Sequence, residues 1–328
     1  MDEFLVPELS LSELDVREII GSGAFSDVHA AFYAGAPAIA KRFRASRGRD
    51  VESFYADELE SARALRGCEG AAPFLGAAGS AQWLVWEDVG RRTLARALDA
   101  AKPFDVVREA IGTSRAGASD AETLAFVGQS IGRATRDVHA FDFIHRDVKP
   151  ANALLDEQNG RIVLCDVGAC ADVRTGRNMD GEAIFDPTYG APEQFRVVQR
   201  RAGGFPNIGG LFGKKTSAKE EETLEYEATG EPPTTLLDAY SLGITLLQVG
   251  VPSLHTPGAI ARARRDIDAC GGDVELWRRQ VCVPGVNDWS LVDETGAWKT
   301  IVRLTRSNPS ERWSVERALE EDAFLAGE

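Results

Sequence analysis

The residues with the clearest chemical potential lie in one short segment, His145-Arg146-Asp147-Val148-Lys149-Pro150-Ala151-Asn152. Asp147 can accept or orient the proton of an attacking hydroxyl group, and Asn152, five residues later, can bind a magnesium ion from the same loop. Lys149 can neutralise a phosphoryl group as it moves. Transfer of a phosphoryl group to a hydroxyl requires in-line geometry, so the base and the metal ligand must keep fixed relative positions. Because the segment matches H-R-D-x-x-x-x-N at all four fixed positions, it predicts phosphoryl transfer.

A second candidate metal ligand, Asp166, follows an apolar run that ends at Cys165. It opens Asp166-Val167-Gly168, a D-F-G element in which valine replaces phenylalanine. A carboxylate at this position would bridge magnesium to a nucleotide triphosphate. We expect Val167 to pack in an apolar slot, although it buries less area than phenylalanine.

Two upstream residues could hold the phosphates. Lys41 ends an expected strand, and Glu58 follows on an expected helix. A strand lysine paired with a helix glutamate holds an ammonium group against two phosphates of a nucleotide. Glu52 and Glu60 are competing acidic partners, so an ordinary surface ion pair stays open as an alternative.

A glycine-containing turn precedes that strand, and it could approach phosphate oxygens because glycine has no Cβ in the way. Its candidate contacts are Gly21, Ser22, Gly23, Phe25, Ser26 and Val28. Ser26 stands where a third glycine is usual, so an ordinary hairpin turn is an alternative interpretation.

The elements that must position these residues change character along the chain. The first third predicts short strands at 14–20, 28–33, 36–43 and 83–86 around one helix at 50–66. Long buried helices are expected at 121–140 and 236–249. This order indicates an α+β arrangement with a cleft between the two parts. Segments 102–119 and 200–233 are rich in glycine and charged residues, so we expect surface loops there.

Further motifs complete an ordered set. Ala191-Pro192-Glu193 matches an A-P-E element, and Asp238 opens a D-x-x-S-x-G pattern. With Arg312, these motifs resemble the eukaryotic protein kinases over essentially the whole chain. The resemblance implies a two-lobed fold, with a small antiparallel β lobe over 1–88 and a large, mainly α lobe over 89–328 that carries the 200–233 insertion. It also implies a buried pair between Glu193 and Arg312.

The same resemblance implies the substrates and the rest of the site. ATP would bind with Mg²⁺, and its γ-phosphate would pass to a serine or threonine of a protein, since Lys149 is the usual mark of that specificity. Tyrosine as an additional acceptor is the alternative. Trp86 would close the rear of the adenine pocket. Backbone groups of Glu87 and Val89 would contact the adenine.

A finer resemblance comes from the segment Asp186-Pro187-Thr188-Tyr189-Gly190-Ala191-Pro192-Glu193-Gln194-Phe195 and from Leu247 to Leu254. Both are similar to the state-transition kinases of the thylakoid, which implies a light-harvesting antenna protein as substrate and a place on the stromal side of the chloroplast thylakoid membrane. Asp186 could pair with Lys149. No transit or membrane segment of that family is found in this sequence, so we expect either a trimmed catalytic domain of such a kinase or a relative that works elsewhere, in the cytoplasm.

Regulation and rival functions can also be framed from the residues. An arginine at the position of Arg146 usually binds a phosphate on the activation segment, which here runs from Asp166 to Glu193. We expect Glu182 or Asp180 to supply a fixed negative charge instead.

A pseudokinase scaffold is the main alternative function, because Ser26, Val167 and Asp186 depart from the usual motifs. A small-molecule kinase of the aminoglycoside or choline type would lack the A-P-E element.

Composition excludes several other classes. The chain of 328 residues carries a net charge of −14, which argues against a nucleic-acid partner. Five cysteines without a C-x-x-C pair indicate thiols in a reducing compartment rather than a disulfide framework. No apolar run approaches the roughly 18 residues of a membrane helix.

Overall fold

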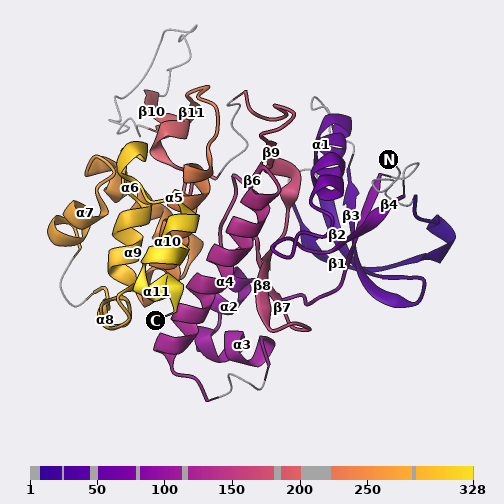
Figure 1. Cartoon of the computed structure of the whole chain (residues 1–328), viewed down its shortest axis with the longest axis horizontal. Coiled ribbons are helices and arrows are strands. Elements are labelled where there is room, and N and C mark those ends of the chain that lie inside the picture. The colour runs from indigo at the N-terminus through magenta and orange to yellow at the C-terminus, as the bar shows by residue number, and fades with distance from the viewer. Residues whose placement is uncertain are drawn as a thin grey trace, which may run out of the picture.

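The computed structural model describes residues 8–23, 26–44, 51–78, 82–112, 117–180, 186–200, 223–282 and 286–327. They form two lobes, with a sheet and one helix at one end and a helical body at the other (Figure 1). The predicted two-lobed α+β fold is confirmed. The sheet ends at Glu87 and the next helix begins at Leu94, so the predicted boundary at 88/89 lies in the connection between them.

The small lobe is a five-stranded antiparallel sheet with the order β1-β2-β3-β5-β4. Its strands are β1 (Leu14–Ser22), β2 (Ser26–Tyr33), β3 (Ala36–Phe43), β4 (Phe74–Ala78) and β5 (Trp83–Glu87). Helix α1 (Val51–Ala64) crosses beside this sheet and corresponds to the helix expected at 50–66 (Figure 1). Strand β4 was not predicted, because glycine and alanine make up most of it and favour strands weakly.

The large lobe is mainly helical. Its helices are α2 (Leu94–Leu98), α3 (Pro103–Ala110), α4 (Asp120–Ala140), α5 (Thr235–Gly250), α6 (Pro257–Ala269), α7 (Val274–Gln280), α8 (Ser290–Glu294), α9 (Ala297–Leu304), α10 (Val315–Glu321) and α11 (Ala323–Ala326). A capping box between Ser119 and Glu122 starts α4, which matches the helix expected at 121–140. Helix α5 matches the one expected at 236–249, and it is buried along nearly its whole length because other helices surround it (Figure 1).

Short strands line the junction between the lobes. They are β6 (Phe143–Ile144), β7 (Ala153–Asp156), β8 (Arg161–Leu164) and β9 (Ala171–Asp172), with a 3-10 turn, η4, at Val167–Ala169. β6 pairs with β9, and β7 pairs with β8. These ladders hold the predicted catalytic loop between β6 and β7, and the Asp166 segment directly after β8.

Two loop expectations were partly wrong. Residues 102–119 contain α3, which begins with Pro103 at its first turn and buries Phe104 and Val107. The segment 200–233 contains β11 (Thr223–Ala228), which pairs with β10 (Phe195–Arg200) in antiparallel register. In both cases packing or pairing with other elements outweighs a loop-like composition: α3 packs against α2 and α4, and β11 pairs with β10. The rest of the predicted loop at 201–222 lies outside the described residues.

All five cysteines are free thiols; Cys68 and Cys170 are buried as expected, whereas Cys165, Cys270 and Cys282 are only partly buried. In the described ranges, no helix has both the length and the apolar character that crossing a bilayer would require.

Candidate active site

A cavity of about 340 Å³ lies between the small lobe and the catalytic loop. Its walls come from β1, β2 and β3 on one side and from α2, β7 and the residues after β8 on the other. The predicted site residues that line it are Gly21, Ser22, Gly23, Ser26, Val28, Lys41, Glu58, Trp86, Glu87, Asn152 and Asp166. The volume falls within the range of small-molecule sites. Residues predicted from separate motifs therefore share one cavity.

Lys41 joins the two lobes at this cavity. Its ammonium donates to Glu58 Oε1 at 2.7 Å, to Glu58 Oε2 at 2.6 Å and to Asp166 Oδ1 at 2.8 Å. Glu58 is 3% exposed and Asp166 is 52% exposed, so one carboxylate is enclosed and the other faces the cavity. The competing residues Glu52 and Glu60 are exposed on α1. The structure thus selects Glu58 as the lysine's partner.

The charges in this group shift one another's protonation. Burial would lower the pKa of Lys41, but the carboxylates of Asp166 and Glu58 raise it above its ordinary value. Burial raises the pKa of Glu58 to about 7, against the opposing effect of Lys41. Lys41 lowers the pKa of Asp166, so this carboxylate remains charged. A charged aspartate facing the cavity is a suitable ligand for a divalent cation.

Asp147 and its neighbours form the second polar group. Lys149 Nζ lies 2.9 Å from Asp147 Oδ2 and 3.6 Å from Asp186 Oδ2, so the pairing expected between Asp186 and Lys149 is present. Asn152 Nδ2 donates to the Asp147 carboxylate at 2.7 Å and to its carbonyl at 2.9 Å. Burial raises the pKa of Asp147, and Lys149 opposes this shift. The loop therefore holds the predicted base, metal ligand and lysine in one hydrogen-bonded unit.

A buried aspartate from α5 fixes the backbone of that loop. Asp238 accepts hydrogen bonds from the N–H of His145 at 2.8 Å and of Arg146 at 2.7 Å, and from His139 Nε2 at 2.8 Å. Arg146 has φ +68°, an unusual left-handed conformation that these hydrogen bonds to Asp238 maintain. The central helix thereby orients the loop that carries Asp147.

The predicted adenine contacts are only partly brought together. Trp86 and Glu87 line the cavity, and the Trp86 ring packs against Phe74 with centroids 5.3 Å apart. Val89 does not line the cavity: it is 2% exposed, and its N–H donates to the Glu87 carbonyl at 3.2 Å. Its own carbonyl accepts from the Glu157 N–H at 2.8 Å. An adenine contact through Val89 would require this turn to open. Phe25 lies outside the described residues.

Several cavity residues were missed by sequence reasoning. Ile39 lines the cavity two positions before Lys41, and the alternation of a strand could have placed it on the same face. Cys165, directly before Asp166, could have been found by adjacency. Arg96 on α2 donates from Nη2 to the Ile20 carbonyl at 2.7 Å. No sequence signal indicates that link between the lobes.

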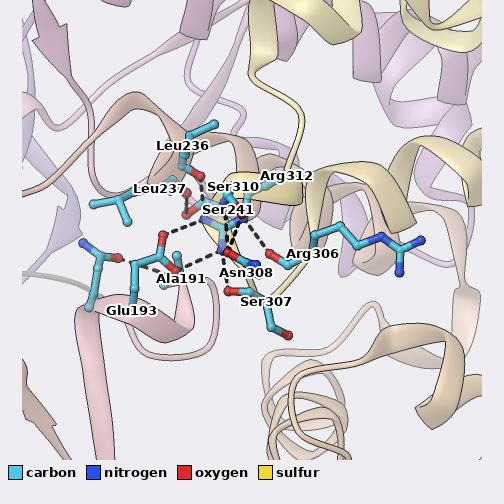
Figure 2. A network of polar contacts seen from close by, with 12 residues as sticks. Ala191, Glu193, Leu236, Leu237, Ser241, Arg306, Ser307, Asn308, Ser310 and Arg312 are labelled. Atoms are coloured by element: carbon cyan, nitrogen blue, oxygen red, sulfur yellow. Dashed lines mark hydrogen bonds and ion pairs between the residues drawn. The ribbon is translucent and has the colours of Figure 1, made fainter.

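The A-P-E element is anchored as predicted. The Arg312 side chain is fully buried and donates to both Glu193 oxygens, at 2.6 and 2.9 Å (Figure 2). It also donates to the carbonyls of Leu236, Arg306 and Ser307 (Figure 2). This network fastens the end of the activation segment to α5 and to the turn before α10.

Arg146 contacts the activation segment through a backbone group. Its Nη1 donates to the Asn178 carbonyl at 2.9 Å. Burial lowers the pKa of Arg146, and the charge of Asp180 opposes this shift. Asp180 is therefore near enough to act as the fixed negative charge proposed from the sequence. Glu182, the other candidate, lies outside the described residues.

The donor set fits a magnesium ion that a nucleotide helps to hold. Asn152 uses Nδ2 on Asp147, which leaves its carbonyl oxygen as the atom suited to a metal. Asp166 uses Oδ1 on Lys41 and is half-exposed to the cavity. Within the described ranges no group of three or more His, Cys, Asp or Glu could enclose a metal. One or two protein ligands plus phosphates is the usual environment of Mg²⁺.

The fold is that of protein kinases. The family model described as "Protein kinase domain" matches residues 14–203, and the chain belongs to this family. Among curated relatives, the Arabidopsis thaliana "Serine/threonine-protein kinase STN7, chloroplastic" is 28% identical over 258 residues, which cover 75% of this chain and 44% of the relative. STN8 from the same plant is 29% identical over 258 residues, covering 75% and 49%. The chain spans less than half the length of these two relatives.

A solved structure, of an Stt7 homolog from Micromonas algae soaked with ATP, has the same fold. It matches with a TM-score of 0.74 and 22% identity, over 97% of this chain and 94% of that chain.

Proposed function

We propose that this chain is an active ATP-dependent serine/threonine protein kinase. The observation that carries the proposal is that two polar groups lie next to each other: the first lines the cavity, and the second reaches it through Asn152. Lys41, Glu58 and Asp166 form the first group, with donor distances of 2.6 to 2.8 Å. Asp147 and Asn152 belong to the second. Asp147 does not line the cavity itself, but the Asn152 side chain that does so donates to it at 2.7 Å, so the groups that phosphoryl transfer requires lie together.

Each residue then has a defined task. Lys41, oriented by Glu58, neutralises nucleotide phosphates, and the glycine turn covers them with backbone groups. Asp166 and Asn152 would hold Mg²⁺, which supplies charge neutralisation at the phosphates when it is bound. Asp147 accepts the proton of the attacking hydroxyl, and Lys149 neutralises the phosphoryl group as it moves.

We further propose a light-harvesting antenna protein as the substrate, phosphorylated at the stromal face of the chloroplast thylakoid membrane. Two observations support this choice. The relatives STN7 and STN8 are chloroplastic serine/threonine kinases by name. The segment from Asp186 to Phe195 is similar to that of state-transition kinases, and its Asp186 lies beside Lys149. This carboxylate is therefore next to the lysine to which we assign the moving phosphoryl group.

The pseudokinase alternative gains no support from the site. Ser26 lines the cavity without filling it, Val167 is 5% exposed in the core, and Asp186 pairs with Lys149. None of these departures removes a group that the reaction needs.

Transfer of labelled γ-phosphate tests the activity. The chain with Mg²⁺ and ATP should phosphorylate isolated thylakoid membranes, and mapping of the labelled residues identifies the substrate and the hydroxyl type. Asp147→Asn should bind ATP but lose at least about 10²-fold in rate, because general-base catalysis is removed. Nucleotide binding without transfer to any protein would establish the scaffold alternative. Transfer to proteins other than antenna components would overturn the substrate proposal alone.

A further inference from the structure

The activation segment reaches back to α1 through one arginine. Arg177, five residues after β9 ends, donates from Nη1 to the Asp57 carbonyl at 2.8 Å. Its Nη2 donates to Ser61 Oγ at 3.1 Å. These acceptors lie one residue before and three residues after Glu58, the helix residue that pairs with Lys41. The guanidinium therefore holds, by two hydrogen bonds, the helical turn that carries Glu58.

On α1, the groups that accept hydrogen bonds from Arg177 are themselves held in place. Ser61 is fully buried, and its hydroxyl also donates to the Asp57 carbonyl at 2.9 Å. Burial raises the pKa of Asp57, and the positive charge of Arg177 opposes this shift. The charge of the guanidinium thus acts on the Asp57 carboxylate, while its hydrogen bond goes to the carbonyl. A charged donor on two acceptors makes a stronger link than a neutral hydrogen bond.

The segment side is held just as firmly. The Arg177 carbonyl accepts from the Asp172 N–H at 3.0 Å, which extends the pairing of β9. Asn178 donates from Nδ2 to the Cys170 carbonyl at 3.0 Å. The Asn178 carbonyl accepts from Arg146, next to the catalytic Asp147. Two consecutive residues therefore connect α1 to the catalytic loop.

The position of α1 matters because little space remains around Glu58. A Cβ added at Gly168, in η4, would lie 2.9 Å from Glu58 Oε2. The helix must stay close to η4 for Glu58 to reach Lys41, so a link that resists outward movement of α1 preserves the ion pair. Arg177 supplies such a link from the large lobe.

The link uses no phosphate. Between Asp166 and Glu193 the sequence contains three hydroxyl residues, Thr175, Thr188 and Tyr189. Tyr189 is buried and donates to Gln248 at 2.6 Å. The donors and acceptors that join the segment to α1 are a guanidinium, a carbonyl and a serine hydroxyl, all present in the unmodified chain.

We propose that Arg177 is a positioning residue that holds α1 inward, so that Glu58 stays on Lys41 in the unphosphorylated chain. This inference rests on the proposed kinase function for its catalytic consequence. Its structural consequence, the restraint of α1, is independent of that function.

Arg177→Met tests the inference, with Arg174→Met as the matched control. Arg174 belongs to the same turn, but its side chain is 59% exposed and its ion pairs with Asp142 and Asp172 are 3.8 and 3.9 Å long. Two hydrogen bonds from a charged donor are lost in Arg177→Met, so kcat should fall about tenfold or more. The KM for the protein substrate should stay within about twofold, because Arg177 contacts α1 and not the substrate segment. Arg174→Met should leave kcat unchanged.

Hydrogen exchange gives a readout that needs no activity. Amides of residues 51–64 should exchange faster in Arg177→Met than in the wild type or in Arg174→Met, while the thermal midpoints of all three remain close. Arg177→Lys should recover part of the protection, because one ammonium reaches one of the two acceptors. Unchanged exchange in Arg177→Met would overturn the inference, as would loss of kcat in phosphatase-treated wild type. A wild type that phosphorylates no protein would reject the proposed function, while the exchange experiment would still judge the role of Arg177.

Discussion

Replacing Arg312 with methionine removes all five guanidinium hydrogen bonds of a side chain with no exposed surface. Two of these contacts reach Glu193, at 2.6 and 2.9 Å, and three reach backbone carbonyls at 2.8 to 3.3 Å. Methionine fills much of the volume but donates nothing, so the carbonyls and the carboxylate lose their partners. Breaking a buried pair in this way costs about 3–5 kcal/mol. Glu193 is 24% exposed and regains some water, so we expect about 3 kcal/mol.

The chain offers a close control in Arg317. Its guanidinium lies 4.2 Å from the Trp313 ring centroid and its Nε lies 3.1 Å from Glu321, but the side chain is 51% exposed. Arg312 has a comparable aromatic contact, 5.0 Å from the Tyr240 centroid. Arg317→Met should lose at most about 0.5 kcal/mol, as exposed pairs one helical turn apart do.

The free energy of unfolding from urea titration of the wild type and both variants measures the difference. We expect Arg312→Met to lie at least about 2 kcal/mol below Arg317→Met. Equal losses in the two variants would refute the argument that burial and complete hydrogen bonding make Arg312 an anchor.

Three further predictions concern the loop and the cavity. Burial would raise the pKa of Asp238, but the hydrogen bonds and charges of His139 and His145 outweigh it, so the pKa is lowered. The ionised Asp238 therefore contributes to stability above the ordinary aspartate pKa, and this contribution is lost as the pH falls through the lower pKa of the folded state. Acid unfolding below about pH 4 should therefore be less steep in Asp238→Asn, and an unchanged slope would contradict this assignment. Asp186→Asn removes a charge 3.6 Å from Lys149 Nζ, so we expect kcat for the protein substrate to fall about threefold to tenfold with little change in the KM for ATP. Trp86→Ala should improve the binding of inhibitors with bulky rear groups at least about tenfold in Kd, and equal binding to both forms would show that Trp86 does not close the rear of the cavity.

The catalytic loop was predictable because its chemistry fixes the spacing between residues. Asp147 and Asn152 must act on one reaction from one short loop, so their separation survives in the sequence itself. The pair of Lys41 and Glu58 was less certain, since three acidic residues on α1 were possible partners. Which of them faces Lys41 depends on how α1 docks against η4, and that is decided by packing between distant segments.

The parts that were missed depend on backbone path rather than on residue type. Val89 turns inward because its amide and carbonyl find partners at Glu87 and Glu157, which no side-chain pattern reveals. Arg177 likewise donates to a backbone carbonyl on an element that lies 120 residues earlier in the chain. Long-range contacts with backbone acceptors leave no periodic signal, so sequence reasoning had no means to find them.

The base of the β10–β11 hairpin brings the two ends of the insertion together. Phe195 pairs with Ala228, and Thr229 donates to the carbonyls of Glu193 at 2.7 Å and Gln194 at 3.0 Å. The chain thus leaves and re-enters the large lobe at adjacent points, next to the carboxylate that Arg312 holds. Once such ends are closed, doubling the length between them costs only about 0.6 kcal/mol. A segment of a different length can therefore occupy this position without separating its two ends or moving the residues that line the cavity.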